Sequence, residues 1–171
     1  WTLTGRKAVV MGGHQAGLIL VSARISGESR DEHGIGLFLI DPQAAGVERR
    51  TYPTVDGRKA CDLYLDKVKV SADHVVGEPG QALAAMRYQQ GRAIAAQCAD
   101  ALGSMQEACR LTLEYLKTRQ QFGVAIGQFQ VLQHRMVDMF MECEQARSMC
   151  YMVTLKIGDE DPVERAKAVS A

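Results

Sequence analysis

The segment whose residue types best suit chemistry is Thr-Arg-Gln-Gln-Phe-Gly, residues 118–123. It interrupts a long amphipathic pattern with a cation, two amides and an aromatic ring. Arg119 carries forked donors that match the oxygens of a pyrophosphate. Gln121 adds an amide that can form hydrogen bonds, and Phe122 offers an apolar face to a purine or another ring. The residues alone allow an alternative, in which a helix simply ends beside a solvated arginine.

Two other segments that resemble chemical motifs do not meet the requirements of those motifs. The loop at residues 12–17 is rich in glycine, but it lacks the G-x-G-x-x-G spacing and no helix follows it, so a plain β-turn is expected. The histidines have neither the i,i+4 spacing nor the neighbouring cysteines of a metal site; they are His14, His33, His74 and His134. We therefore predict no metal site, and no Ser-His-Asp pattern is visible.

The cysteines indicate the compartment rather than the chemistry. There are five, an odd number without C-x-x-C spacing, at positions 61, 98, 109, 143 and 150. This pattern fits neither a disulfide framework nor a zinc site. We expect buried, inert thiols in a reducing cytoplasm.

The composition narrows the class of protein. The chain has 171 residues, of which 47% are apolar, so it can bury a core. Basic and acidic residues number 20 each, which argues against a nucleic-acid-binding protein because such proteins carry a basic excess. No apolar run approaches the length of a membrane-spanning helix, so no span is predicted.

The first part of the chain, residues 1–76, reads as β-structure. Short apolar runs predict strands at 8–11, 18–23 and 36–40, separated by turns rich in Gly, Asp and Pro. The segment 63–70 alternates, and a break in its phase suggests a β-bulge; the residues expected to face inward are Leu63, Leu65, Val68 and Val70. Because no βαβ spacing is present, an antiparallel sheet or barrel is expected.

The pattern changes to helical periodicity after residues 77–80, Gly-Glu-Pro-Gly. Long helices are predicted at about 81–118 and 128–157. A third helix is expected to begin at Pro162, with Asp161 as its cap. Short connections between long helices favour an antiparallel bundle. Two helices and a stub cannot close such a bundle, so we expect the chain to be an internal piece of a longer protein.

The combination of these motifs resembles the acyl-CoA dehydrogenase family. The C-terminal signature of that family is matched by Arg119–Gly123, Ile126–Gly127, Phe129–Gln130, Gln133–His134 and Asp138–Met139. The β-domain of the family is resembled by Leu3–Lys7, Val21–Arg24, Gly36–Asp41, Gly46–Val47 and Asp66–Val70. Within the family, the chain is most similar to the small subunit of pimeloyl-CoA dehydrogenase.

The resemblance implies an α+β fold. Residues 1–76 would form part of an antiparallel β-barrel domain, and residues 77–171 would form part of an antiparallel four-helix bundle. It also implies α,β-dehydrogenation of an acyl-CoA thioester, with hydride transfer to FAD and with electron-transfer flavoprotein as a partner. The catalytic base would lie beyond Ala171. The subunits would form a homo-oligomer or a heteromer with a related subunit.

Site residues follow from the same resemblance. Arg119, Gln121 and Phe122 would contact the pyrophosphate and adenosine end of FAD across a subunit interface. Gln130 would add to that site, and Arg92 would lie near the acyl-CoA pocket.

The sequence departs from the family pattern at four positions. Val9 and Met11 replace a Trp and a Thr that lie beside the flavin in many relatives, and neither replacement donates a side-chain hydrogen bond. Gln89 replaces an Asp, and Gly91 stands where some members carry the catalytic Glu. Two alternatives stay open: a non-catalytic scaffold subunit of a heteromeric dehydrogenase, and a helical oligomerisation module without flavin.

Overall fold

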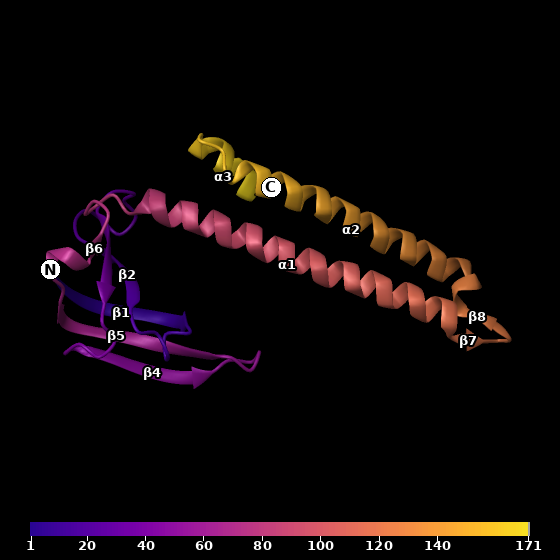
Figure 1. Cartoon of the computed structure of the whole chain (residues 1–171), viewed down its shortest axis with the longest axis horizontal. Coiled ribbons are helices and arrows are strands. Elements are labelled where there is room, and N and C mark those ends of the chain that lie inside the picture. Colours follow the sequence, from indigo (N-terminus) through magenta and orange to yellow (C-terminus); the bar gives the residue numbers. More distant parts are fainter. Residues whose placement is uncertain (171) are drawn as a thin grey trace. The chain divides into compact units, whose positions relative to one another are not determined.

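The structure is a computed structural model that describes residues 1–170 and divides into two compact units, Trp1–Met86 and the chain from Arg87 onward (Figure 1). Its fold is α+β, as predicted. Residues 80–82, just before the first long helix, pack within the first unit. The backbone N–H of Gly34 donates to the carbonyl of Gly80 at 2.8 Å, and that of Ala82 donates to Ile35 at 3.0 Å. Ala82 is buried.

Within residues 1–86 the strands form two antiparallel three-stranded sheets. The first has the order β1 (Thr2–Met11), β5 (Lys59–Lys69), β4 (Val47–Pro53). The second has the order β2 (Ile19–Arg24), β3 (Ile35–Ile40), β6 (Val75–Val76), and a 3-10 turn, η1 (Ala72–His74), precedes β6. The described strands do not close into a barrel.

Both sheets contribute to one apolar core, whose buried members are Leu3, Ile19, Val21, Phe38, Ile40, Leu63, Leu65, Val68 and Val70. The four residues of this core at positions 63–70 were predicted to face inward, and this is confirmed. The predicted bulge is also present: the pairing with β1 jumps from Leu3↔Val68 to Gly5↔Leu65. Lys67 adopts a left-handed φ of 51° at this point, which restores the inward direction of the side chains.

A half-buried carboxylate links three strands of the first sheet. Asp62 accepts hydrogen bonds from the guanidinium of Arg6, from the hydroxyl of Tyr52 at 3.1 Å and from the backbone N–H of Val9 at 3.2 Å. Val9 has a left-handed φ of 54°, at a second register shift in the pairing of β1 with β5. Asp62 therefore holds a strained segment of β1 in place.

The second unit is a helical hairpin. It consists of α1 (Leu83–Thr118), the short strands β7 (Gln120–Gln121) and β8 (Val124–Ala125), the 3-10 turn η2 (Ile126–Gln128), α2 (Gln130–Lys156) and α3 (Pro162–Ser170). Figure 1 shows α1 and α2 running side by side in opposite directions. The backbone N–H of Val163 donates to the carboxylate of Asp161 at 2.8 Å, so the predicted cap of α3 is confirmed. None of the described helices is long and apolar enough to cross a membrane.

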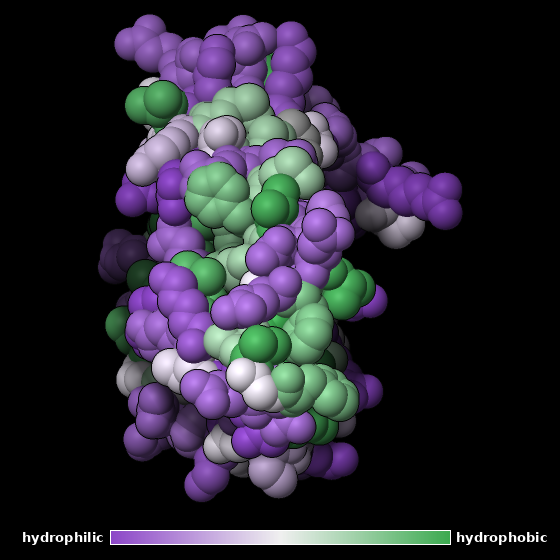
Figure 2. Space-filling view, turned by 90° about the vertical axis from the view of Figure 1, so that its right-hand side faces the viewer, coloured by the Kyte–Doolittle hydropathy of each residue, from purple (hydrophilic) through white to green (hydrophobic). Residues whose placement is uncertain are grey.

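The helices bury only part of their apolar surface. Cys143, Cys150 and Val153 of α2 are buried as their periodicity predicts, but Phe140 is 58% exposed. Figure 2 shows hydrophobic patches among hydrophilic ones on the face that it presents. The expectation of buried thiols is wrong for Cys98, which is exposed, and only partly right for Cys109, which is half-buried. The reason is that α2 covers only one side of α1 and leaves the other apolar side chains of α1 exposed.

The close approach at Gly127 gives a stability prediction. A Cβ atom at this position would lie 2.9 Å from the backbone carbonyl oxygen of Leu116, which cannot move without disturbing the end of α1. We expect Gly127→Ala to destabilise the protein by about 1–3 kcal/mol, as overpacking does. Gly103→Ala adds the same methyl group in open space within α1, and it should stabilise by about 0.5–1 kcal/mol. Thermal unfolding of both variants measures the contrast, and a Gly127→Ala protein as stable as Gly103→Ala would contradict it.

The Asp62 network predicts a dependence of stability on pH. The hydrogen bond from Arg6, followed by that from the backbone of Val9, lowers the pKa of the Asp62 carboxyl below its usual value. A carboxyl with a lowered pKa stabilises the fold above its unfolded pKa of about 3.9, and this contribution is lost as the pH falls through the folded pKa. Asp62→Asn should be less stable at pH 7, and the difference from the parent should shrink below about pH 4. Denaturant unfolding at several pH values checks this; a constant difference would refute it.

Candidate functional site

The predicted ligand-binding segment forms the connection between the two long helices. α1 ends at Thr118, whose hydroxyl donates to the carbonyl of Glu114 at 2.9 Å. The backbone of Arg119 then joins both sides of the connection. Its N–H donates to the carbonyl of Tyr115, and its own carbonyl accepts from the N–H of Ile126, both at 2.9 Å. Arg119 is therefore fixed at the base of the β7–β8 hairpin, against the end of α1.

The hairpin turn places an aromatic ring in solvent at the expense of backbone strain. Phe122 and Gly123 form its two central residues, with φ of 54° and 81°. Two positive φ values are typical of a type I′ turn, where Asn-Gly is the favoured pair. A left-handed conformation costs a bulky residue about 1–2 kcal/mol. The Phe122 ring is nevertheless 93% exposed, and its only aromatic neighbour within residues 1–170 is Phe129, at 6.2 Å and an interplanar angle of 84°.

Polar groups on the hairpin remain open to a ligand. The side chains of Arg119 and Gln121 are exposed, and within residues 1–170 no ion pair engages the guanidinium of Arg119. Gln130 is the first residue of α2, whose first turn contains no acidic residue. The N-terminus of a helix carries unpaired N–H groups and a partial positive charge. The structure thus brings together the four residues predicted to bind the cofactor, on the hairpin and at the start of α2.

The base of the hairpin is held by the second helix. The side-chain amide of Gln133 donates to the carbonyl of Gly127 at 2.9 Å, and the N–H of Phe129 donates to Ile126 at 3.1 Å. Since Gly127 also approaches the backbone of Leu116, the connection is anchored to α1 and α2 together. This arrangement limits the movement of Arg119 and Phe122 relative to the helix ends.

Arg92, the predicted substrate contact, lies in a different place. It is separated from Arg119 by about 40 Å along α1, at 1.5 Å per residue. Its guanidinium lies 5.8 Å from the centre of the Tyr88 ring and donates to the Tyr88 hydroxyl at 3.4 Å. Arg165 of α3 also lies over this ring, at 5.5 Å. The structure therefore does not bring Arg92 together with the hairpin residues.

Of the four positions that depart from the family pattern, three are exposed and one is buried. Val9 and Met11 on β1 are 60% and 48% exposed, and Gln89 on α1 is exposed. Gly91 is buried: a Cβ atom there would lie 2.6 Å from the Cδ1 atom of Ile157. A side chain at position 91 would have to displace the side chain of Ile157, so the space beside Gly91 is taken up by helix packing.

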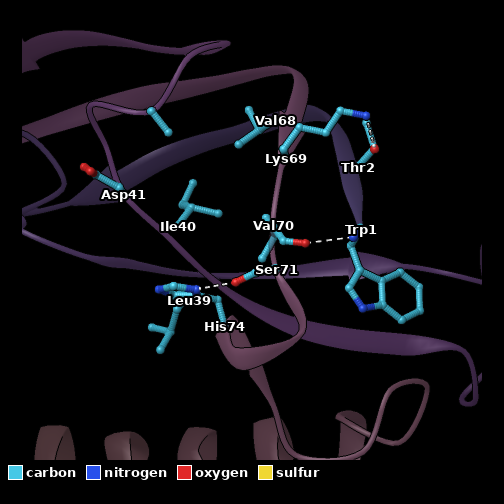
Figure 3. A pocket seen from close by; sticks show the side chains of 11 residues that line it. Trp1, Thr2, Leu39, Ile40, Asp41, Val68, Lys69, Val70, Ser71 and His74 are labelled. Carbon is cyan, nitrogen blue, oxygen red and sulfur yellow. Dashed lines mark hydrogen bonds between the residues drawn. The ribbon is translucent and has the colours of Figure 1, made fainter.

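A surface pocket in the first unit was not predicted from the sequence. It has a volume of about 560 Å³ and is lined by residues of β1, β3 and β5 and of the turn that follows β5 (Figure 3). Ser71 and His74 share a hydrogen bond of 2.8 Å, and Lys69 donates to Thr2 at 3.0 Å. Within the described residues no hydrogen bond joins Asp41 to His74, so the pocket contains no Ser-His-Asp triad. Its polar groups satisfy one another, and the hairpin remains the better candidate site.

Comparison with known proteins identifies two domains of one family along the chain. Residues 80–171 match the acyl-CoA dehydrogenase C-terminal domain, and residues 1–68 match the middle domain of the same family. A short-chain-specific acyl-CoA dehydrogenase of Megasphaera elsdenii is 30% identical over 95% of this chain and 43% of its own length. The solved butyryl-CoA dehydrogenase from that organism has a TM-score of 0.79 and 29% identity, over 98% of this chain and 45% of its own.

A second similar structure contains FAD. It is that of PigA with FAD and proline, with a TM-score of 0.87 and 26% identity over 98% of this chain and 45% of its own. The present chain thus spans less than half the length of the relatives that it matches. With matches to both domains of the family, in the order in which the chain carries them, this protein belongs to the acyl-CoA dehydrogenase family.

Proposed function

We propose that the whole protein is an FAD-dependent acyl-CoA dehydrogenase, which removes hydrogen from the α and β carbons of an acyl-CoA thioester. The observation that carries this proposal is the hairpin, which holds a strained, solvent-exposed Phe122 and an exposed Arg119. Strain of this kind persists where function requires it. Family membership and the FAD in the PigA structure support the choice of cofactor.

The hairpin residues fit the pyrophosphate and adenosine end of FAD. Arg119 would bind the pyrophosphate through two parallel hydrogen bonds, which are stronger and more directional than those of a lysine. Gln121 would add an amide hydrogen bond, and Phe122 would stack on or beside the adenine. Gln130 would contribute from the first turn of α2. When bound, the flavin supplies the hydride acceptor for the reaction.

The separation along α1 favours an oligomer. A dinucleotide bound at Arg119 does not extend to Arg92, about 40 Å away along the helix. We propose that Arg92 serves the acyl-CoA pocket of its own subunit, while Arg119 serves the FAD of a neighbouring subunit. The exposed apolar side chains of α1 and α2, such as Leu113 and Phe140, are then available for subunit contacts. A cytoplasmic location and electron transfer to electron-transfer flavoprotein complete this proposal.

A second candidate function is a non-catalytic scaffold subunit of a heteromeric acyl-CoA dehydrogenase. Val9 and Met11 favour it, because they leave only backbone donors where many relatives present a hydrogen-bonding side chain to the flavin. Absorbance spectra of the purified whole protein separate the candidates. A bound yellow cofactor that acyl-CoA bleaches under anaerobic conditions supports the enzyme. A flavin that no acyl-CoA bleaches supports the scaffold, and the absence of flavin supports a helical oligomerisation module.

The first test of the cofactor site changes Arg119. A charge-assisted contact of about 1.5–3 kcal/mol corresponds to a change in affinity of roughly 10- to 150-fold. Arg119→Ala in the whole protein should lose FAD retention by this factor, and Arg119→Lys should lose less because it keeps the charge. Flavin content after dialysis is the measurement, with circular dichroism to verify helix content. Arg135→Ala removes an exposed arginine from α2, outside the hairpin, and should retain FAD. Equal retention in all three variants would place the cofactor elsewhere.

A second test separates the ring of Phe122 from the turn that holds it. Phe122→Asn creates Asn-Gly, the pair that a type I′ turn favours, and should stabilise the protein by up to about 1 kcal/mol. The same change removes the stacking ring, so FAD retention should fall by roughly 3- to 10-fold, for a stacking contribution of about 1 kcal/mol. Thermal unfolding of the flavin-free protein and flavin content after dialysis give the two values. A variant that is more stable and still retains FAD would show that the ring does not bind the cofactor.

A further inference from the structure

Two cysteines from different helices lie in direct contact. The Sγ atoms of Cys109 on α1 and Cys143 on α2 are 3.2 Å apart. Cys143 is only 5% exposed, and Cys109 is half-buried. Both thiols are free, and the dehydrogenase function proposed above assigns neither of them a role.

The distance between the sulfur atoms is close to that needed for a covalent bond. A disulfide requires about 2.05 Å between its sulfur atoms. The observed separation therefore has to shorten by about 1 Å, through rotation of both side chains and a closer approach of α1 and α2. Cys98 is exposed on α1, but within the described residues it contacts no second sulfur, so it offers a matched control.

We propose that Cys109 and Cys143 are a redox-sensitive pair, which a peroxide converts into a disulfide between α1 and α2. In the first step the Cys109 thiolate attacks one peroxide oxygen, the O–O bond breaks, and a sulfenic acid and hydroxide form. In the second step the sulfur of Cys143 attacks the sulfur of the sulfenic acid, and hydroxide leaves. The thiols lose two electrons and two protons, and hydrogen peroxide is reduced to two molecules of water.

Exposure and acidity assign the order of the two steps. Cys109 reaches solvent, so a small oxidant meets it first. The hydrogen bond with Cys109, followed by burial, raises the pKa of the Cys143 thiol and keeps it protonated at neutral pH. A protonated, buried thiol is a poor first nucleophile, but it is well placed to resolve the sulfenic acid beside it.

The bond would close a covalent loop that contains the whole hairpin. Arg119 and Phe122 lie between the two cysteines in the sequence. A cross-link over a loop of this length restricts the unfolded chain, and we expect it to raise the unfolding temperature of the whole protein by roughly 5 °C. It would also fix the spacing of α1 and α2 close to the proposed cofactor site.

The experiment treats the whole protein with hydrogen peroxide and measures the intact mass and the unfolding temperature; the remaining thiols are then blocked and the cross-linked peptides are identified. We expect a loss of about 2 Da, a peptide joining Cys109 to Cys143, and the higher unfolding temperature. Dithiothreitol should reverse all three results. Cys98→Ser should behave like the parent, and both Cys109→Ser and Cys143→Ser should show neither the cross-link nor the temperature shift.

Several outcomes would overturn the proposal. They are a sulfinic or sulfonic acid on Cys109 with Cys143 still reduced, a cross-link that involves another cysteine, and no oxidation at a peroxide dose that modifies Cys98. The result does not depend on the dehydrogenase activity, because the readouts are mass and stability. If no disulfide forms, the proposed dehydrogenase function is unaffected. If the protein is not a dehydrogenase, the disulfide proposal is likewise unaffected.

Discussion

The contact between α1 and α2 is the interaction on which the helical unit depends. Two glycines leave room for contacts near its ends: Gly91 of α1 lies against the side chain of Ile157, just after α2, and Gly127, in the turn before α2, lies against the backbone of Leu116. Between these places Cys109 of α1 and Cys143 of α2 are in direct contact. The β7–β8 hairpin contributes little packing of its own. Its position is set by the helices that enter and leave it, and the arrangement of Arg119 and Phe122 follows from this contact.

The extent of the fold that could be predicted depended on how strongly periodic each segment is. The bounds of α1 and α2 were predicted to within about two residues, because their apolar residues repeat over many turns. The inward side chains at 63–70 were predicted by alternation with one break in phase. Strand β4 was not predicted, because its outward residues, Glu48 and Arg50, are charged and it lies at the edge of its sheet. The hairpin strands are two residues each, too short to show any period.

In the candidate site, the residue types could be predicted from the sequence, but the backbone conformation could not. The grouping of Arg119, Gln121 and Phe122 was visible in the sequence because chemically distinct residues interrupt a helical pattern. The left-handed backbone conformation of Phe122 could not be seen in the sequence, because residue preferences assign this conformation to Gly or Asn. The Asp62 network was also missed. Its partners, Arg6 and Tyr52, lie on two other strands, and only the strand pairing brings them to the carboxylate.

The length of α1 determines which active site of the oligomer a mutation in one subunit affects. The helix spans 36 residues, and in the proposed assembly its two ends belong to active sites of different subunits. A defect at the hairpin end would then disable a site in the neighbouring subunit and leave the subunit's own substrate pocket intact. In a mixed oligomer, one copy defective only in the hairpin and another defective only in the pocket could still form one complete site between them. The genetic unit of activity would therefore be the pair of subunits rather than the single chain.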